Sequence, residues 1–160
     1  MKVIAEIANT HEGDISYFFK HINELFVSGI KNIKVQYIIP SELGNPGSAS
    51  FKEFSRLEIK ENEYLELLSR FKSTNFFFDV FGNQSLDSVI NLSKKYTNIK
   101  GIKFHTTNSM NFDLIIEASK FFNVIFGNFI KSFTNSSSYS STSLKKAIAK
   151  FTLSKSFFRY

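Results

Sequence analysis

Short apolar runs alternate with amphipathic helical patterns, and this alternation limits the folds open to the chain. Five runs have the length and composition of buried strands: Val3–Ala8, Asn32–Ile38, Phe76–Phe81, Ile99–Phe104 and Val124–Phe126. Apolar residues recur at helical spacing in the segments between them: Ser16–Ser28, Glu61–Lys72, the residues after Ser85 and the residues after Asn111. Strand and helix in repeated alternation predict βαβ units around a parallel sheet, which is an α/β fold.

The strands are expected to carry polar side chains near their carboxyl ends. Alternate residues of a strand point to opposite faces of its sheet, so Lys34 and Gln36 share a face, as do Lys103 and His105. Asp79 falls on the same side of its strand as Phe77 and Phe81. A lysine at a strand end is often only a solvated rim residue, and a lone histidine is often structural. The repetition on successive strands nevertheless favours one shared polar site.

Glu6 lies inside the first apolar run, and His11 follows in the turn after it. A buried carboxylate costs several kcal/mol unless a partner compensates it. Lysines at the same end of the sheet would supply that partner, and they would suit an anionic ligand. The parity of the first strand predicts that Glu6 faces the polar side, whereas Ile7 packs against the helices. Among the three histidines, no pair has a recognisable metal-ligand spacing, so no metal ligands are assigned.

The net charge of +6 belongs to the end of the chain, since six basic and no acidic residues follow position 130. Residues 1–130 are expected to form the folded domain, and residues 131–160 a basic tail rich in Ser and Thr. Its one expected helix, at 143–153, has an apolar stripe. A solvated tail is the common explanation of such a charge run. Binding of nucleic acid through the tail remains an alternative function, although no recognisable module supports it.

The composition narrows the location and chemistry of the protein. No apolar run reaches the roughly 20 residues of a membrane helix, and the first residues lack the features of a secretory signal. The chain has no cysteine, which excludes disulfides and thiolate chemistry. We therefore expect a cytoplasmic protein that does not contact membranes.

Three motifs resemble the N-acetylneuraminate (sialic acid) synthase family. They read IAEIANTHEGD from Ile4, IKVQY from Ile33, and IKFHTTNSMNFDLIIEAS from Ile102. The family shows AEIGxNHxG, then VKFQ, then YKIxSxxxNxxL, in the same order. The resemblance implies a (β/α)8 barrel that condenses phosphoenolpyruvate with an N-acetylated aldose to give a nonulosonic acid and phosphate. By the same resemblance the protein is a transferase that uses a divalent metal ion, Mn or Mg.

The resemblance also assigns roles to individual residues of this chain. Glu6 matches the catalytic glutamate of the first strand, and His11 belongs to the motif's turn. Lys34, Gln36, Lys103 and Thr106 match residues that bind phosphoenolpyruvate. Asp79, by contrast, stands in the segment FDVF, where the family usually reads STPF and offers a phosphate donor. We therefore expect a weaker anion site than in a full synthase.

An eight-unit barrel needs at least about 200 residues, whereas this chain has 160. Only five to six βα units are present, and the family's metal-binding histidines lie on later strands. We therefore expect a truncated member that is inactive alone and that self-associates or pairs with a complementary chain. The alternative is a non-catalytic remnant or subunit that keeps the fold and binds anions.

The segment Pro40–Ser50 is expected to be a loop after the second strand.

Overall fold

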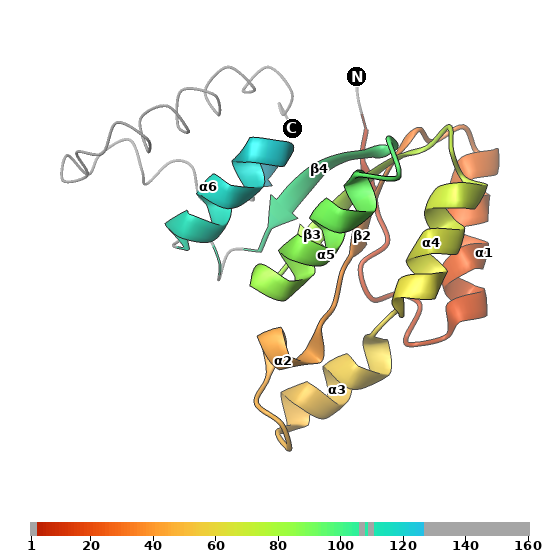
Figure 1. The fold of residues 1–160 in the computed structure, drawn as a ribbon. Helices are drawn as coiled ribbons and strands as arrows, with labels where there is room; N and C mark the ends of the chain where they lie inside the picture. The colour runs from red at the N-terminus through yellow and green to blue at the C-terminus, as the bar shows by residue number, and fades with distance from the viewer. Residues whose placement is uncertain (1–2, 106–107, 109–110, 127–160) are drawn as a thin grey trace.

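The computed structural model describes residues 3–105, 108 and 111–126 and shows one parallel sheet with helices between its strands (Figure 1). The strands are β1 (Ala5–Glu6), β2 (Asn32–Gln36), β3 (Asn75–Val80), β4 (Ile99–Phe104) and β5 (Asn123–Phe126). They pair in chain order, β1-β2-β3-β4-β5, and every pair is parallel. This confirms the predicted α/β class. In the described part of the chain β1 and β5 are the two edges, so the barrel is not closed.

Four helices connect successive strands: α1 (Ile15–Val27), α4 (Glu61–Arg70), α5 (Asn83–Ser93) and α6 (Phe112–Phe121). Two of them begin at side-chain caps that leave fewer amide groups without a partner. Asp14 Oδ1 accepts hydrogen bonds from the Ser16 and Tyr17 amides at 2.8 and 3.0 Å. Asn111 Oδ1 accepts one from the Leu114 amide at 3.2 Å. α5 begins before Ser85 and not after it, because the Ser85 hydroxyl accepts hydrogen bonds from the amides of residues 81 and 82.

The core lies between the helices and one face of the sheet. Ile33, Phe76, Phe78 and Ile102 alternate along their strands with residues of the other face, and all four are fully buried. They pack in one cluster with helix residues such as Tyr64. Each such side chain contributes roughly 1.5–3 kcal/mol when it leaves water. This apolar face of the sheet packs against the helices, so the polar residues of the strands lie on the opposite face.

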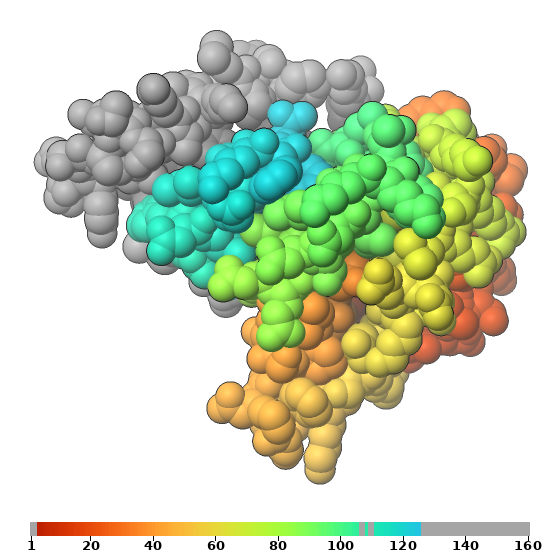
Figure 2. Space-filling model, in the orientation of Figure 1, coloured from red at the N-terminus to blue at the C-terminus, as the bar shows by residue number. Residues whose placement is uncertain are grey.

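The prediction of a loop at Pro40–Ser50 is wrong in part. Pro40–Leu43 forms the short helix α2, and α3 (Ala49–Leu57) begins at Ala49. The proline stands at the first helical position, where it needs no amide partner, and Ser48 caps α3 by accepting from the Phe51 amide at 3.1 Å. Leu57 joins a small second core with Ile38 and Phe81. Figure 2 shows α2 and α3 as a lobe at the bottom of the molecule.

Two strands are shorter than predicted. β1 was expected over Val3–Ala8, but Ala8 has φ +47°, a left-handed conformation that a strand does not contain. β2 ends at Gln36, two residues before the predicted end. The predicted sixth unit, the basic tail and the helix at 143–153 lie outside the described residues. Every helix in the described part of the chain falls short of the length and apolar character that a bilayer crossing needs.

Candidate functional site

A chain of ion pairs crosses four strands on the polar face of the sheet, the face opposite the core. Lys34 Nζ lies 2.5 Å from Glu6 Oε1 and 3.0 Å from Asp79 Oδ2. Lys103 Nζ lies 3.3 Å from the same Asp79 oxygen. The structure therefore brings together four of the predicted site residues, and we name Glu6, Lys34, Asp79 and Lys103 the polar cluster.

The strand register produces this arrangement. Glu6 is the pairing partner of Lys34, and Asp79 is the partner of both Gln36 and Lys103. Residues paired across parallel strands point to the same face, so a row of side chains forms from strand to strand. Lys34 lies two residues before Gln36, the pairing partner of Asp79. Its long side chain reaches across this offset to the Asp79 carboxylate. Glu6 therefore faces the polar side, as strand parity predicted.

Burial makes these charges depend on each other. The side chains of Lys34 and Asp79 are only 6% and 2% exposed, whereas that of Glu6 is 49% exposed. Burial lowers the pKa of Lys34, and Lys103 lowers it further, against the opposing effects of Glu6 and Asp79. Burial also acts to lower the pKa of Lys103, but its contact with Lys34 and the nearby carboxylates raise it overall. Lys34, the more deeply buried of the two, therefore holds its proton less tightly than an exposed lysine does.

Two buried oxygens of the polar face have no hydrogen-bond partner among the described residues. They are Asp79 Oδ1 and Gln36 Oε1, and their residues are paired across β2 and β3. The Gln36 carbonyl accepts a hydrogen bond from the Tyr64 hydroxyl at 2.5 Å, which fixes the strand but not the amide side chain. Buried polar atoms are usually satisfied by protein or ordered water. The two free acceptors therefore offer positions for hydrogen-bond donors of water or a ligand.

The remaining predicted residues are less closely joined to the polar cluster. His105 follows β4 and is exposed, with its ring centroid 6.4 Å from that of Phe81. Thr106 lies outside the described residues. Asn108, which the site prediction did not include, donates a hydrogen bond to the Phe81 carbonyl and ties the loop after β4 to the end of β3. A single asparagine in a loop carries no sequence signal for that contact.

His11 was predicted as a residue of the polar mouth, but its recorded contacts belong to the turn between β1 and α1. Its ring lies edge-on to Phe18 of α1, and its side chain is buried. Nδ1 accepts a hydrogen bond from the Gly13 amide at 3.0 Å. Burial lowers the pKa of His11, and the charges of Arg56 and His21 lower it further. These contacts give His11 a structural role in the turn.

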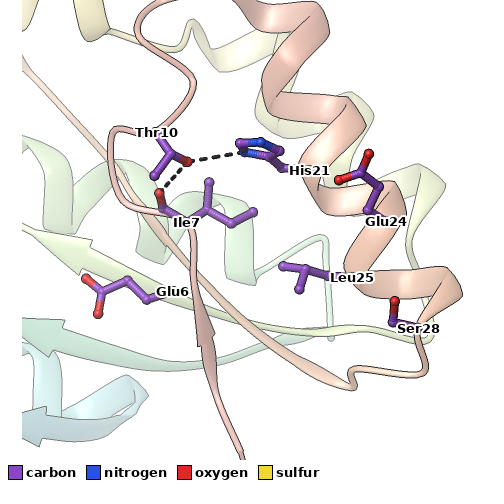
Figure 3. Close-up of a pocket in the computed structure, with 7 residues that line it drawn as sticks. All are labelled: Glu6, Ile7, Thr10, His21, Glu24, Leu25 and Ser28. Carbon is purple, nitrogen blue, oxygen red and sulfur yellow. Dashed lines mark hydrogen bonds between the residues drawn. The ribbon is translucent and has the colours of Figure 1, made fainter.

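A cavity of about 310 Å³ lies between β1 and α1 (Figure 3). Figure 3 shows Ile7 pointing towards α1, whereas Glu6 points away from it. At the rim of the cavity the Thr10 hydroxyl lies 3.2 Å from Nδ1 of His21. The cavity is at the outer edge of β1, where the described sheet has no further strand. Sequence patterns did not predict it, because it depends on how the residues after β1 pack against α1 and not on the residue types of the motif.

The described residues do not fit the divalent metal ion that the resemblance implies. In the described part of the chain no group of three or more His, Cys, Asp or Glu side chains could hold a metal ion. The carboxylates of the polar cluster are already paired with lysines, whose charge opposes a cation. No chemical step is therefore assigned to a metal here.

A solved structure provides a comparison for this geometry. It is the N-acetylneuraminic acid (sialic acid) synthetase from Leptospira borgpetersenii serovar Hardjo-bovis in complex with citrate, and it matches with a TM-score of 0.71. The two chains share a fold. Their sequence identity is 20%, and the match covers 96% of this chain and 50% of the synthetase chain. The chain thus spans half the length of that protein, whose fold is a TIM barrel.

Comparisons of the sequence itself found no relative. No family model matches the chain, and no curated protein does so. The likeness therefore concerns the fold: five parallel strands and their helices correspond to part of a synthetase barrel.

Proposed function

We propose that this chain forms part of a nonulosonic acid synthase barrel and that its polar cluster binds phosphoenolpyruvate. The supporting observation is the pair of lysines on β2 and β4, both within 3.3 Å of one Asp79 oxygen on the open polar face. Two ammonium groups that reach the same carboxylate oxygen can also bind a carboxylate and a phosphate of one small molecule. The similarity to a sialic acid synthetase fold and the three sequence motifs support the same choice.

The proposed reaction joins phosphoenolpyruvate to an N-acetylated aldose and releases phosphate. In it, Lys34 and Lys103 offset the negative charge of phosphoenolpyruvate and stabilise the charge that develops on the departing phosphate. Glu6 is half-exposed and touches Lys34, so its carboxylate is placed to accept or return a proton at the reacting groups. Gln36 and Thr106 are assigned to the same ligand by resemblance only. The acceptor sugar is not assigned to residues of this chain.

A second candidate function is anion binding without turnover, as a part or subunit that keeps the barrel fold. The charge balance of the polar cluster favours it, because Glu6 and Asp79 neutralise the two lysines. Such a site must separate its internal ion pairs before it holds an external anion, which weakens binding. We expect a polypeptide of these 160 residues to bind phosphoenolpyruvate weakly and to release no phosphate from it.

Calorimetric titration with phosphoenolpyruvate tests the binding site. We expect Lys34→Ala combined with Lys103→Ala to abolish binding. The matched control combines Lys31→Ala with Lys100→Ala, which removes two exposed lysines from the same two strand regions. The control should bind like the wild type, and Asp79→Asn should bind more tightly because it frees both lysines. Equal binding by the wild type and the Lys34 and Lys103 double variant would contradict the proposal.

A turnover assay then separates the two candidate functions. It supplies phosphoenolpyruvate, N-acetylmannosamine and manganese and measures phosphate release. Release at about one per second or faster, an ordinary enzymatic rate, assigns catalysis to these residues alone. Binding without release supports the anion-binding candidate.

A further inference from the structure

The polar cluster contains a feature that anion binding does not require. Lys34 and Lys103 share a single oxygen of Asp79, and this carboxylate is 2% exposed. Lys34 has a second partner in Glu6, which can accept a proton. A buried amine beside another cation and a proton acceptor is the arrangement that activates lysine as a nucleophile.

We propose that Lys34 forms a Schiff base with the carbonyl carbon of a small 2-oxo acid, whose carboxylate is held by Lys103. This activity is separate from phosphoenolpyruvate binding, because phosphoenolpyruvate has no free carbonyl group. The Lys103 side chain is 22% exposed and that of Glu6 is 49% exposed, so the two groups that flank Lys34 both reach the solvent. Asp79 lies between the lysines and stabilises the cation that forms.

The proposed step balances without any further reactant. The ammonium of Lys34 first gives a proton to Glu6, and the neutral amine attacks the carbonyl carbon to form a nitrogen–carbon bond. The carbonyl oxygen takes the proton from Glu6, which gives a carbinolamine with a protonated nitrogen. That nitrogen returns a proton to Glu6, which passes it to the hydroxyl group. The hydroxyl leaves as water, and one positive charge remains on the iminium nitrogen.

The surroundings select Lys34 over Lys103 as the nucleophile. Lys34 is the more deeply buried of the two and lies between two carboxylates, whereas Lys103 touches one. Burial lowers the pKa of Lys34, while the pKa of Lys103 is raised. Burial therefore favours the neutral amine at Lys34, while the more exposed Lys103 is left to hold the substrate carboxylate. Exposed lysines such as Lys100 have none of these partners among the recorded ion pairs of the described residues.

Reductive trapping tests this assignment. The 160-residue chain is incubated with pyruvate and sodium borohydride, which reduces an imine to a stable secondary amine, and the modified lysine is located by peptide mass spectrometry. We expect the adduct at Lys34, formed faster than at any exposed lysine and at lower pH. Labelling spread evenly over exposed lysines, with no excess at Lys34, would overturn the proposal.

Variants separate a reactive lysine from a structural one. Lys34→Arg keeps the positive charge but cannot form an imine, so the adduct should disappear, while Lys100→Arg should leave it unchanged. Lys103→Met should shift labelling of Lys34 to higher pH, because it removes the neighbouring cation. If Lys34→Arg fails to fold, the wild-type peptide map and the Lys103→Met pH profile still decide the matter. An unchanged pH profile in Lys103→Met would contradict the role given to the lysine pair.

Discussion

Single residues of the polar cluster show how one carboxylate changes the character of a site. Asp79 stands between two lysines that would otherwise repel each other, and it holds both within 3.3 Å of one oxygen. The positive charge of the two lysines is therefore partly neutralised within the site. Any anionic ligand, phosphoenolpyruvate or a 2-oxo acid alike, must therefore compete with Asp79 for the two lysines.

His11 gives a pH-dependent prediction at the same scale. Its folded pKa is lowered by burial from the ordinary value of 6.5, so the folded chain binds fewer protons here than the unfolded chain. Its contribution to stability is complete above about pH 6.5 and is lost as the pH falls towards the folded pKa. Protonation would also remove the acceptor that the Gly13 amide uses. Urea unfolding between pH 7.5 and 4.5 should show this loss.

The control for His11 is a second histidine of the same region. His11→Gln should flatten the pH dependence below about pH 6.5, whereas His21→Gln should retain it because His11 is still present. If both variants keep the wild-type slope, another group causes it and the assignment to His11 is wrong.

Strand parity predicted the common face of Glu6, Lys34, Asp79 and Lys103, because side chains alternate strictly along a strand. It also predicted that a lysine would compensate Glu6, as Lys34 does. It could not predict that Asp79 would hold both lysines, since register and side-chain reach depend on the assembled sheet. His11 was placed in the polar mouth by its motif, but the phenylalanine one helical turn into α1 gives its ring an apolar partner. Residue patterns thus predicted which face of the sheet a side chain occupies, whereas its interaction partners depend on the packing of the folded chain.

The turn between β1 and α1 and helix α3 hold each other in place. Arg56 of α3 donates a hydrogen bond to the Glu12 carbonyl, and its guanidinium also pairs with Glu53 at 2.6 Å. Gly13 lies against the backbone of Arg56, which leaves no room for a side chain. The sequence predicted the turn from its polar residues, but not α3, so this contact between distant segments could not be foreseen.

Two glycines with similar backbone angles provide a matched test of that contact. Gly13 and Gly29 have φ of +85° and +81°, but of the two only Gly13 would bring a new Cβ against a backbone oxygen, that of Arg56. Gly29→Ala should cost about 1 kcal/mol, the strain of a left-handed residue. Gly13→Ala should cost distinctly more in urea unfolding, since the turn must also move away from α3. Equal costs would show that this close approach has no energetic weight.

At the scale of the whole molecule, both edge strands of the described sheet lack a further partner strand. β1 has only two residues and β5 four, and each pairs with a single neighbour within the described part of the chain. Open edges and exposed apolar side chains favour association with other chains. On the helices nearest these edges, Val27 is 75% and Phe121 is 52% exposed. The alternation of strands and helices predicted the parallel order, but closure depends on segments beyond those described.

We therefore expect the 160-residue chain to self-associate, and we expect the exposed apolar residues to drive it. Val27→Gln combined with Phe121→Gln removes both apolar side chains without changing the net charge. Sedimentation velocity at several concentrations should show the wild type shifting to larger species as concentration rises, and the double variant shifting less. Asn23→Gln, an exposed position on the same helix as Val27, should behave like the wild type. A wild-type chain that stays monomeric at all concentrations would show that its edges are already covered.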